Sequence, residues 1–421
     1  MSDRRTTVAL AAWVSAWMVG CAHGPTPPPP AVPPTRPPTE EAREAFEDAS
    51  SVFARHEAAG QWDGEACHET LAAFERAQDA LGGRDGRAVY MSGMVAQRCG
   101  NDEGARQLWS RALELDPSLC QPRVALGIDA LEQGHAERAR AHFEEAVRRD
   151  NRCVTGYVNL AAIQSRHPGE REAAVANLRR ALAVRADYLP AFDRLALTYL
   201  AQAESQPELL DLAAMVCRQA QLVDPTYAPI YNTWALIDLR RGDVTGAAAK
   251  LARAVELDPT FFEALMNFGQ LTLSQRAYRD AVGAFRRARE LRPRSYDAAL
   301  GLGVALRGLE RPEEAERLYR AATELDEDRP EAWFDLAVLY QEHREGSVEQ
   351  LRQAEAFLQE FVRRARGEDR FAETVREVMR WCDGEGSRRR RDACRPGRAQ
   401  RIHQSLAIQG ERPDQRPDWL R

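Results

Sequence analysis

The chain has 421 residues, of which 44% are hydrophobic and 29% are charged, a composition that fits a soluble globular body. Its formal net charge is −6 at pH 7, so the overall charge gives no indication of nucleic-acid binding and we predict no nucleic-acid partner. The charge is uneven, because residues 384–421 hold ten arginines against five acidic residues and follow an acidic body. Positive charge is almost entirely arginine, and Lys250 is the only lysine.

The N-terminus begins with a short polar segment that holds two arginines, followed by thirteen uncharged residues, 8–20. A membrane-spanning helix needs about 20 apolar residues, so this run is too short to cross a bilayer and has the length of a secretory signal core. Cys21 follows it directly. Residues 22–39 contain nine prolines, which favour an extended polyproline II spacer of about 55 Å.

The segment MVGC, residues 18–21, resembles the signal of bacterial lipoproteins, although Met18 replaces the usual leucine. The resemblance implies that residues 1–20 are a signal peptide and that Cys21 is acylated and becomes the first residue of a tethered linker, 21–39. Ala22, rather than aspartate, implies an outer-membrane location facing the periplasm. A plain signal peptide and a chance apolar start of a cytosolic protein remain as alternatives.

The body contains an internal repeat. The hexamers ALELDP, AQLVDP, AVELDP and ARELRP share one pattern, and each ends in proline. Counted through the equivalent sites of all units, the gaps are 34, 35, 39, 34, 34 and 34 residues. Within a unit, small residues such as Gly127 and Ala139 and an aromatic residue such as Phe143 recur at fixed offsets on apolar stripes, which predicts two amphipathic helices in each unit.

This pattern resembles the tetratricopeptide repeat, a helix–turn–helix unit of 34 residues. The resemblance implies an all-α fold, a right-handed superhelical solenoid of about nine repeats, over residues 40–383. The first repeat is degenerate, and residues 368–381 form a closing helix. Residues 384–421 form a basic, mostly disordered tail.

In this family the first helix of each unit lines a concave groove, so the resemblance implies a partner-binding groove at fixed positions of each unit. Several of these side chains could instead pack between repeats. Asn159 and Asn267 are isolated asparagines, which argues against a carboxylate clamp. The predicted groove residues are Tyr90, Met94, Val124, Ile128, Leu131, Val158, Leu197, Leu200, Leu236, Leu239, Met266, Leu273, Leu300, Val304, Phe334 and Val338.

Sequence motifs for catalysis are absent: there is no phosphate-binding glycine loop, no nucleophile elbow and no zinc-protease motif. His135 and His142 stand seven residues apart, and surface histidines explain them better than a metal site does. We therefore predict no enzymatic activity, no cofactor, no metal and no small-molecule substrate.

Eight cysteines are present. In a tetratricopeptide array the start of one helix meets the end of the next, which places Cys67 near Cys99. Cys120 and Cys153 occupy nearly matching sites of adjacent units, at a separation that is marginal for a disulfide. Cys382 and Cys394 flank the basic run and could also pair. Cys217 replaces the core aromatic residue and should be a buried thiol.

The basic run itself comprises Arg388, Arg389, Arg390 and Arg391. Behind a secretory signal these arginines could bind an acidic protein or an anionic envelope polymer, or they could simply keep the tail soluble.

Taken together, the sequence resembles the tetratricopeptide lipoproteins of myxobacteria-like organisms, which serve gliding motility or type IV pilus assembly. The resemblance implies an outer-membrane scaffold that binds proteins of the cell envelope, attached to the membrane through lipid on Cys21. Two alternatives remain: an adaptor of peptidoglycan synthases or hydrolases, and a regulatory subunit of an enzyme.

Overall fold

The computed structural model describes residues 39–342 and 347–382, and all regular structure in these ranges is helical. The sequence prediction of an all-α fold is confirmed. The helices are α1 (Glu40–Ala59), α2 (Gly64–Ala80), α3 (Gly86–Arg98), α4 (Asp102–Leu115), α5 (Cys120–Glu132), α6 (Ala136–Arg149), α7 (Val154–Gln164), α8 (Arg171–Val184), α9 (Leu189–Gln202), α10 (Leu209–Val223), α11 (Ala228–Arg241), α12 (Val244–Leu257), α13 (Phe262–Ser274), α14 (Tyr278–Leu291), α15 (Tyr296–Gly308), α16 (Pro312–Leu325), α17 (Glu331–Glu342), α18 (Val348–Ala365) and α19 (Ala372–Cys382), with 3₁₀ turns η1 (Pro168–Glu170) and η2 (Asp369–Phe371).

Successive helices pack as hairpins, from α1 with α2 to α17 with α18, which gives nine hairpins in the described residues. The last helix, α19, packs on α18 and closes the stack. Each hairpin also packs on the next, so the apolar faces of one unit are covered by its neighbours. The nine hairpins of the described residues therefore agree with the predicted number of about nine repeats.

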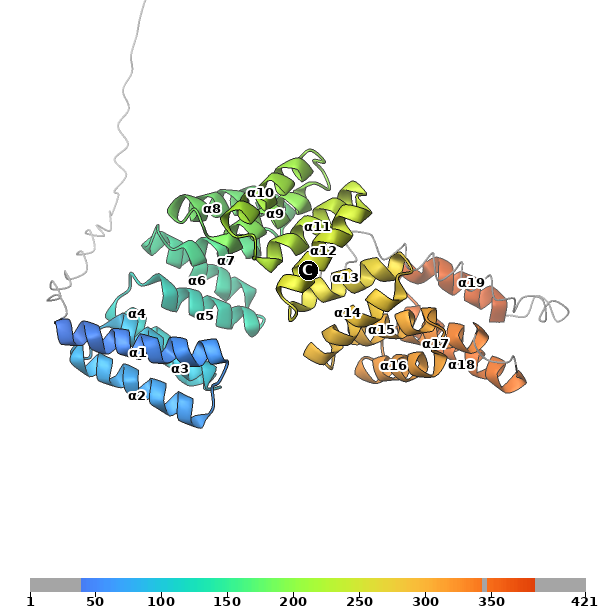
Figure 1. Ribbon diagram of the computed structural model, residues 1–421, viewed down its shortest axis with the longest axis horizontal. Helices are drawn as coiled ribbons and strands as arrows, with labels where there is room; N and C mark the ends of the chain where they lie inside the picture. Colours follow the sequence, from blue (N-terminus) through green and yellow to red (C-terminus); the bar gives the residue numbers. More distant parts are fainter. Residues whose placement is uncertain (1–38, 343–346, 383–421) are drawn as a thin grey trace, which may run out of the picture.

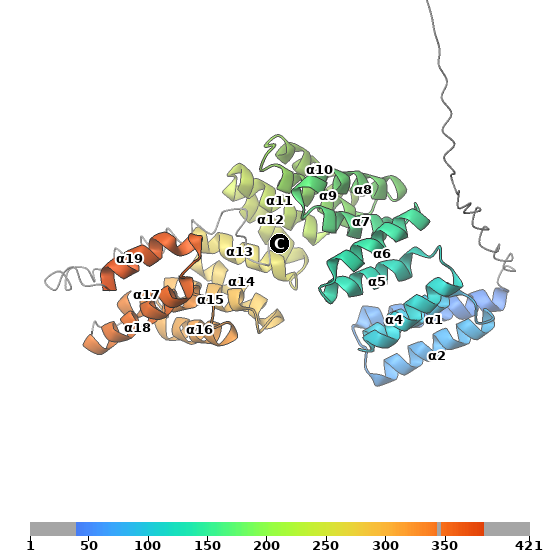
Figure 2. The same cartoon turned by 180° about the vertical axis from the view of Figure 1, so that it is seen from behind.

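The odd-numbered and even-numbered helices form two layers. From α5 to α17 each odd-numbered helix contacts the next odd-numbered one, whereas the even-numbered helices do not approach one another as closely. Because the odd-numbered helices are spaced more closely than the even-numbered ones, the stack curves toward the odd-numbered layer. Figures 1 and 2 show the resulting arch, with α8 and α10 at its top in both views and the two ends of the helical array below. No described helix combines the length and apolarity needed to cross a membrane.

An aromatic side chain of the outer helix presses against a glycine of the inner helix in several hairpins. A Cβ atom added to Gly127 would stand 2.4 Å from the ring of Phe143. Phe285 lies between two glycines: a Cβ on Gly269 of its own hairpin would stand 2.8 Å from the ring, and one on Gly301 of the next hairpin 2.7 Å. The small residues of the repeat are therefore required by the close approach of the helices.

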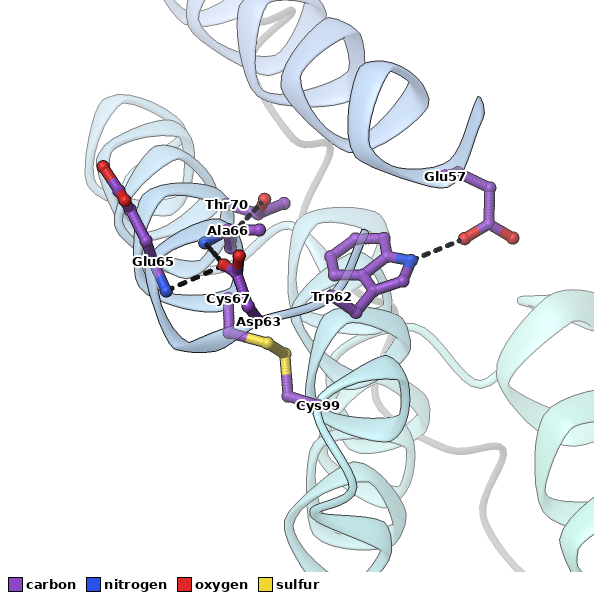
Figure 3. Close-up of a disulfide and its surroundings, with 8 residues drawn as sticks. All are labelled: Glu57, Trp62, Asp63, Glu65, Ala66, Cys67, Thr70 and Cys99. Carbon is purple, nitrogen blue, oxygen red and sulfur yellow. Dashed lines mark hydrogen bonds between the residues drawn. A yellow bond between two sulfur atoms is a disulfide. The ribbon is translucent and has the colours of Figure 1, made fainter. Parts of the chain in front are cut away.

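Two disulfides join the first four hairpins in pairs, the first to the second and the third to the fourth. Cys67, in the first turn of α2, is bonded to Cys99 at the end of α3, with a Cα–Cα distance of 6.0 Å. Figure 3 shows this bond beside the start of α2, where the Asp63 side chain accepts hydrogen bonds from the amides of Glu65 and Ala66 at 3.1 and 2.9 Å.

The second disulfide joins Cys120 and Cys153, whose Cα atoms are 5.7 Å apart. These cysteines stand at the starts of α5 and α7, the inner helices of consecutive hairpins. The sequence analysis judged the separation of Cys120 and Cys153 marginal for a disulfide. The two inner helices approach closely enough at their starts for the bond to form. Cys217 is a free, buried thiol in α10.

Several sequence predictions concern residues outside the described part of the chain. Cys21, Cys394 and the arginine run Arg388 to Arg391 lie there. Cys382 ends α19, but its side chain is not described. The linker, the tail and the proposed pairing of Cys382 with Cys394 therefore stay predictions.

The glycine contacts predict opposite effects of two matched substitutions. Gly269→Ala should lower the free energy of unfolding by about 1–3 kcal/mol, because the new methyl group would collide with Phe285. Gly283→Ala, in the adjacent helix with no heavy atom within 4 Å of the added Cβ, should leave stability unchanged or raise it by about 0.5–1 kcal/mol. Urea titrations followed by circular dichroism measure both. Equal urea midpoints for the two variants would contradict the packing described here.

Candidate protein-binding surface

The inner face is the surface formed by the odd-numbered helices α3 to α17 at the positions that the repeat pattern assigns to the groove. One such position, three residues before the small residue of each inner helix, recurs through the array with the spacing of the repeat. In chain order it holds Tyr90, Val124, Val158, Asp193, Asn232, Met266, Leu300 and Phe334.

Five of the sixteen predicted groove residues are buried in the core, and for these the prediction of an open groove position is wrong. Their side chains belong to the apolar clusters between helices and are not available to a partner. The positions alone do not reveal this, because burial at a given position varies with the size of its neighbours in the adjacent helices. The buried residues are Val124, Leu200, Met266, Phe334 and Val338.

The other predicted residues remain accessible to different degrees. Ile128 is exposed, at 37% of its full area. The remaining ten are half-buried and extend from the second hairpin to the eighth. They form a discontinuous apolar lining along the inner face, a kind of surface that binds segments of other chains. They are Tyr90, Met94, Leu131, Val158, Leu197, Leu236, Leu239, Leu273, Leu300 and Val304.

The centre of the inner face carries polar side chains that the sequence analysis missed. The hydroxyl of Thr233 in α11 donates a hydrogen bond of 2.5 Å to the carboxylate of Asp193 in α9. One unit further, the amide of Asn267 in α13 donates to the amide oxygen of Asn232 in α11 at 2.8 Å. Asn267 is therefore not isolated, whereas Asn159 donates a hydrogen bond within its own helix, to the carbonyl of Thr155. Following the repeat position through every unit, polar or not, would have found Asp193 and Asn232.

Asp193 is half-buried among apolar groups, and its environment favours the protonated form. Burial raises the pKa of its carboxyl to about 6, while the hydrogen bond from Thr233 and the charge of Arg194 oppose this shift. Burial, together with the nearby Asp193 carboxylate, also raises the pKa of Tyr227 and of Cys217. The inner face thus contains a carboxyl group that titrates close to neutral pH.

Charged side chains connect the last two hairpins. Arg329 pairs with Asp297 at 2.9 Å and with Glu331 at 3.4 Å, and its guanidinium stacks on the ring of Tyr296 at 3.9 Å. Arg370, from the turn before α19, pairs with Glu331 at 3.0 Å. These contacts hold α15, α17 and the closing segment together.

The described residues contain no group of three or more histidine, cysteine, aspartate or glutamate side chains that could hold a metal ion. His135 precedes α6 and is exposed, and His142 lies half-buried in that helix, where burial lowers the pKa of its imidazole.

Comparison with known proteins identifies the repeat. The tetratricopeptide-repeat family profile matches residues 124–165, 232–293, 266–330 and 300–369. No curated protein matches the sequence. The solved structures that resemble the chain include TTC0263, a tetratricopeptide protein of Thermus thermophilus, with 25% identity over 45% of this chain and 99% of that chain and a TM-score of 0.41.

Two further solved structures are similar to the chain. The Cut9–Hcn1 assembly of the APC/C gives a TM-score of 0.51 with 13% identity, over 68% of this chain and 54% of the other. PilF of Pseudomonas aeruginosa gives 0.42 with 16% identity, over 52% and 96%. The stacked helical hairpins, the family profile and the likeness to the Cut9–Hcn1 assembly together show an all-α tetratricopeptide superhelix. Proteins of this type generally mediate protein–protein interactions and are typically not enzymes, and the comparisons indicate no catalytic family.

Asp193 gives a prediction with a defined pH dependence. Because its folded-state pKa lies above the value of an unfolded chain, its ionised form destabilises the fold at pH values above about 6, and this cost is lost as the pH falls toward about 4. Asp193→Asn keeps an acceptor for Thr233 and should raise Tm by about 2–4 °C at pH 8.

The gain in Tm should shrink as the pH is lowered from about 6 to about 4, because the wild-type carboxyl is then protonated. Thermal unfolding of both proteins across this range is the measurement. A variant that is less stable than the wild type at pH 8 would contradict the assignment.

Proposed function

We propose that the chain is a scaffold of the bacterial cell envelope, tethered through lipid on Cys21 to the outer membrane and facing the periplasm, that binds protein partners along its inner face. The observation that carries the proposal is the lining of half-buried apolar side chains from Tyr90 to Val304 on the inner helices. Burial of the exposed part of such apolar side chains against a bound segment is favourable, because it removes apolar area from water.

The two disulfides support an exported location. Disulfides of this kind persist in oxidising compartments such as the periplasm and are rare in the cytosol. Each links neighbouring helices at sequence separations of 32 and 33 residues, so each restricts the unfolded chain substantially. Together with the apolar run before Cys21 and the proline-rich spacer, they favour a chain that leaves the cytosol and stays attached to a membrane.

The bound partners are envelope proteins that present an extended or helical segment with apolar side chains. The half-buried carboxyl of Asp193 lies near the middle of the lining and would select a polar group of that segment. The paired amides of Asn232 and Asn267 are buried and join α11 to α13. The resemblance of the sequence to myxobacterial lipoproteins favours a gliding-motility or pilus-assembly complex as the setting.

Photocrosslinking in cells tests the binding face. Benzoylphenylalanine would replace Tyr90, Leu236 or Leu300 on the inner helices and, as matched controls, Ala249, Gly283 or Arg317 on the outer helices. We expect the inner positions to capture the same envelope protein, identified by mass spectrometry, with at most weak capture from the outer positions. Capture from the outer positions alone would refute an inner binding face.

Mass spectrometry of the N-terminal peptide tests the anchor separately. The mature chain should begin at Cys21 and carry the added mass of a diacylglyceryl group, and Cys21→Ala should abolish that mass while Cys217→Ala leaves it unchanged. A chain that keeps Met1 and a free Cys21 thiol would exclude lipid anchoring.

A further inference from the structure

The outer surface of α10 exposes large apolar side chains. Leu212, Met215 and Leu222 are 42%, 62% and 73% exposed, and Val223 at the end of the helix is 38% exposed. Their spacing of three and seven residues puts Leu212, Met215 and Leu222 on one side of the helix. The opposite side of α10 is buried through Ala213, Cys217 and Ala220. The exposed row is therefore not part of the packing between hairpins.

The positions of Met215 and Leu222 hold no large apolar side chain in the other outer helices, whereas the position of Val223 holds Leu115, Val184, Leu257, Leu291 and Leu325. The core alanines Ala112, Ala146, Ala181, Ala220, Ala254, Ala288 and Ala322 align the outer helices α4 to α16. The position of Met215, five residues before this alanine, holds Gln107, Ala141, Ala176, Ala249, Gly283 and Arg317 in the other helices. The position of Leu222, two residues after it, holds Glu114, Arg148, Ala183, Glu256, Glu290 and Glu324. The exposed apolar row is thus a property of α10 and not of the repeat.

Exposed arginines occur on the same outer helix and on the one before it. Arg218 of α10 is exposed and forms no ion pair with any described residue, and Arg179 and Arg180 are exposed on α8. The carboxylate next to Leu212, Asp211, is paired with Arg241. Val184, at the end of α8, is 36% exposed. In both views α8 and α10 lie next to each other at the top of the arch (Figures 1 and 2). We call Leu212, Met215, Leu222, Val223 and Val184, with the three arginines, the crest patch.

The position of the crest patch restricts what can cover it. The patch lies on α8 of the fourth hairpin and α10 of the fifth, in the middle of the nine hairpins in the described residues. A convex body touches a flat surface at its crest. In a symmetric pair of two copies the same patches would meet, and the arginines of both copies would enter one interface to which the patch contributes no carboxylate. A surface of anionic lipid offers phosphates to the arginines and an acyl layer to the leucine and methionine side chains.

We propose that the crest patch rests on the anionic phospholipid surface of the membrane, so that the solenoid lies on its outer side with its inner face turned toward the periplasm. The proposal rests on the proposed envelope location, and it adds a second membrane contact to the lipid anchor. A single lipid-modified end leaves the orientation of the body free, whereas a second contact at the crest fixes it.

Vesicle flotation tests the proposal without the lipid anchor. The protein is the chain of residues 21–421 with Cys21→Ala, which contains the whole solenoid but neither the signal segment nor the acylated cysteine. The probes are vesicles of phosphatidylethanolamine with phosphatidylglycerol and vesicles of phosphatidylcholine alone, at low and high salt. We expect flotation with the anionic vesicles at low salt, weakened by high salt and by Arg218→Gln.

A triple variant, Leu212→Glu, Met215→Glu and Leu222→Glu, should lower the bound fraction about tenfold. The matched control, Leu291→Glu, Val348→Glu and Leu351→Glu, also replaces three exposed side chains, at 40%, 67% and 37%, and should bind like the parent. Circular dichroism establishes that both variants fold.

The proposal is overturned if the parent chain does not float with anionic vesicles, or if the two triple variants bind equally. It is also overturned if light scattering shows a dimer that only the crest variant converts to a monomer, because the patch would then join two copies. None of these outcomes depends on acylation of Cys21 or on capture of a partner at the inner face, so a failure here leaves the proposed function separately testable.

Discussion

The fold depends on one packing constraint: in most hairpins an aromatic or other bulky side chain of the outer helix must fit against a glycine or alanine of the inner helices, and in α10 Cys217 takes this place. Phe143 against Gly127, and Phe285 between Gly269 and Gly301, show this contact within a hairpin and between hairpins. Since the same contact must recur at every step, the spacing of the chain is nearly fixed at 34 residues. The longest interval, 39 residues, places its extra length in the loop of residues 203–208 between α9 and α10 and leaves the helices in register.

That constraint also separates the two surfaces of the molecule. The inner helices approach one another closely, so their remaining side chains form the concave lining, and polar links such as Thr233 to Asp193 connect one unit to the next there. The outer helices diverge, and most of them carry arginine and glutamate pairs three or four residues apart, such as Arg253 with Glu256. The outer side of α10 differs from these charged surfaces, because it carries the apolar row Leu212, Met215 and Leu222.

The sequence predicted those features that depend on the repeat period and failed at those that depend on neighbouring side chains. The helices, their pairing and the number of hairpins follow from the period, because the repeated contact of small and aromatic residues leaves little freedom. Burial at single groove positions depends on the neighbouring side chains as well. Met266 and Leu300 hold the same repeat position, yet Met266 is buried and Leu300 is half-buried.

The predicted groove residues were all apolar, so the polar contacts of the inner helices were missed. Asp193 and Asn232 occupy that same position, but a search for apolar residues passes over them. The sequence analysis did not single out the crest patch, because the sequence alone does not show which side of α10 is buried.

The central claim is that a stack of hairpins, with its first units joined by disulfides, works outside the cytosol. The most direct test is thiol mapping of the protein isolated from its own cells, with free thiols blocked at lysis and again after denaturation. The account predicts peptides that link Cys67 to Cys99 and Cys120 to Cys153, and a Cys217 thiol that is blocked only after denaturation, since it is buried. Four unlinked cysteines at positions 67, 99, 120 and 153 would contradict it.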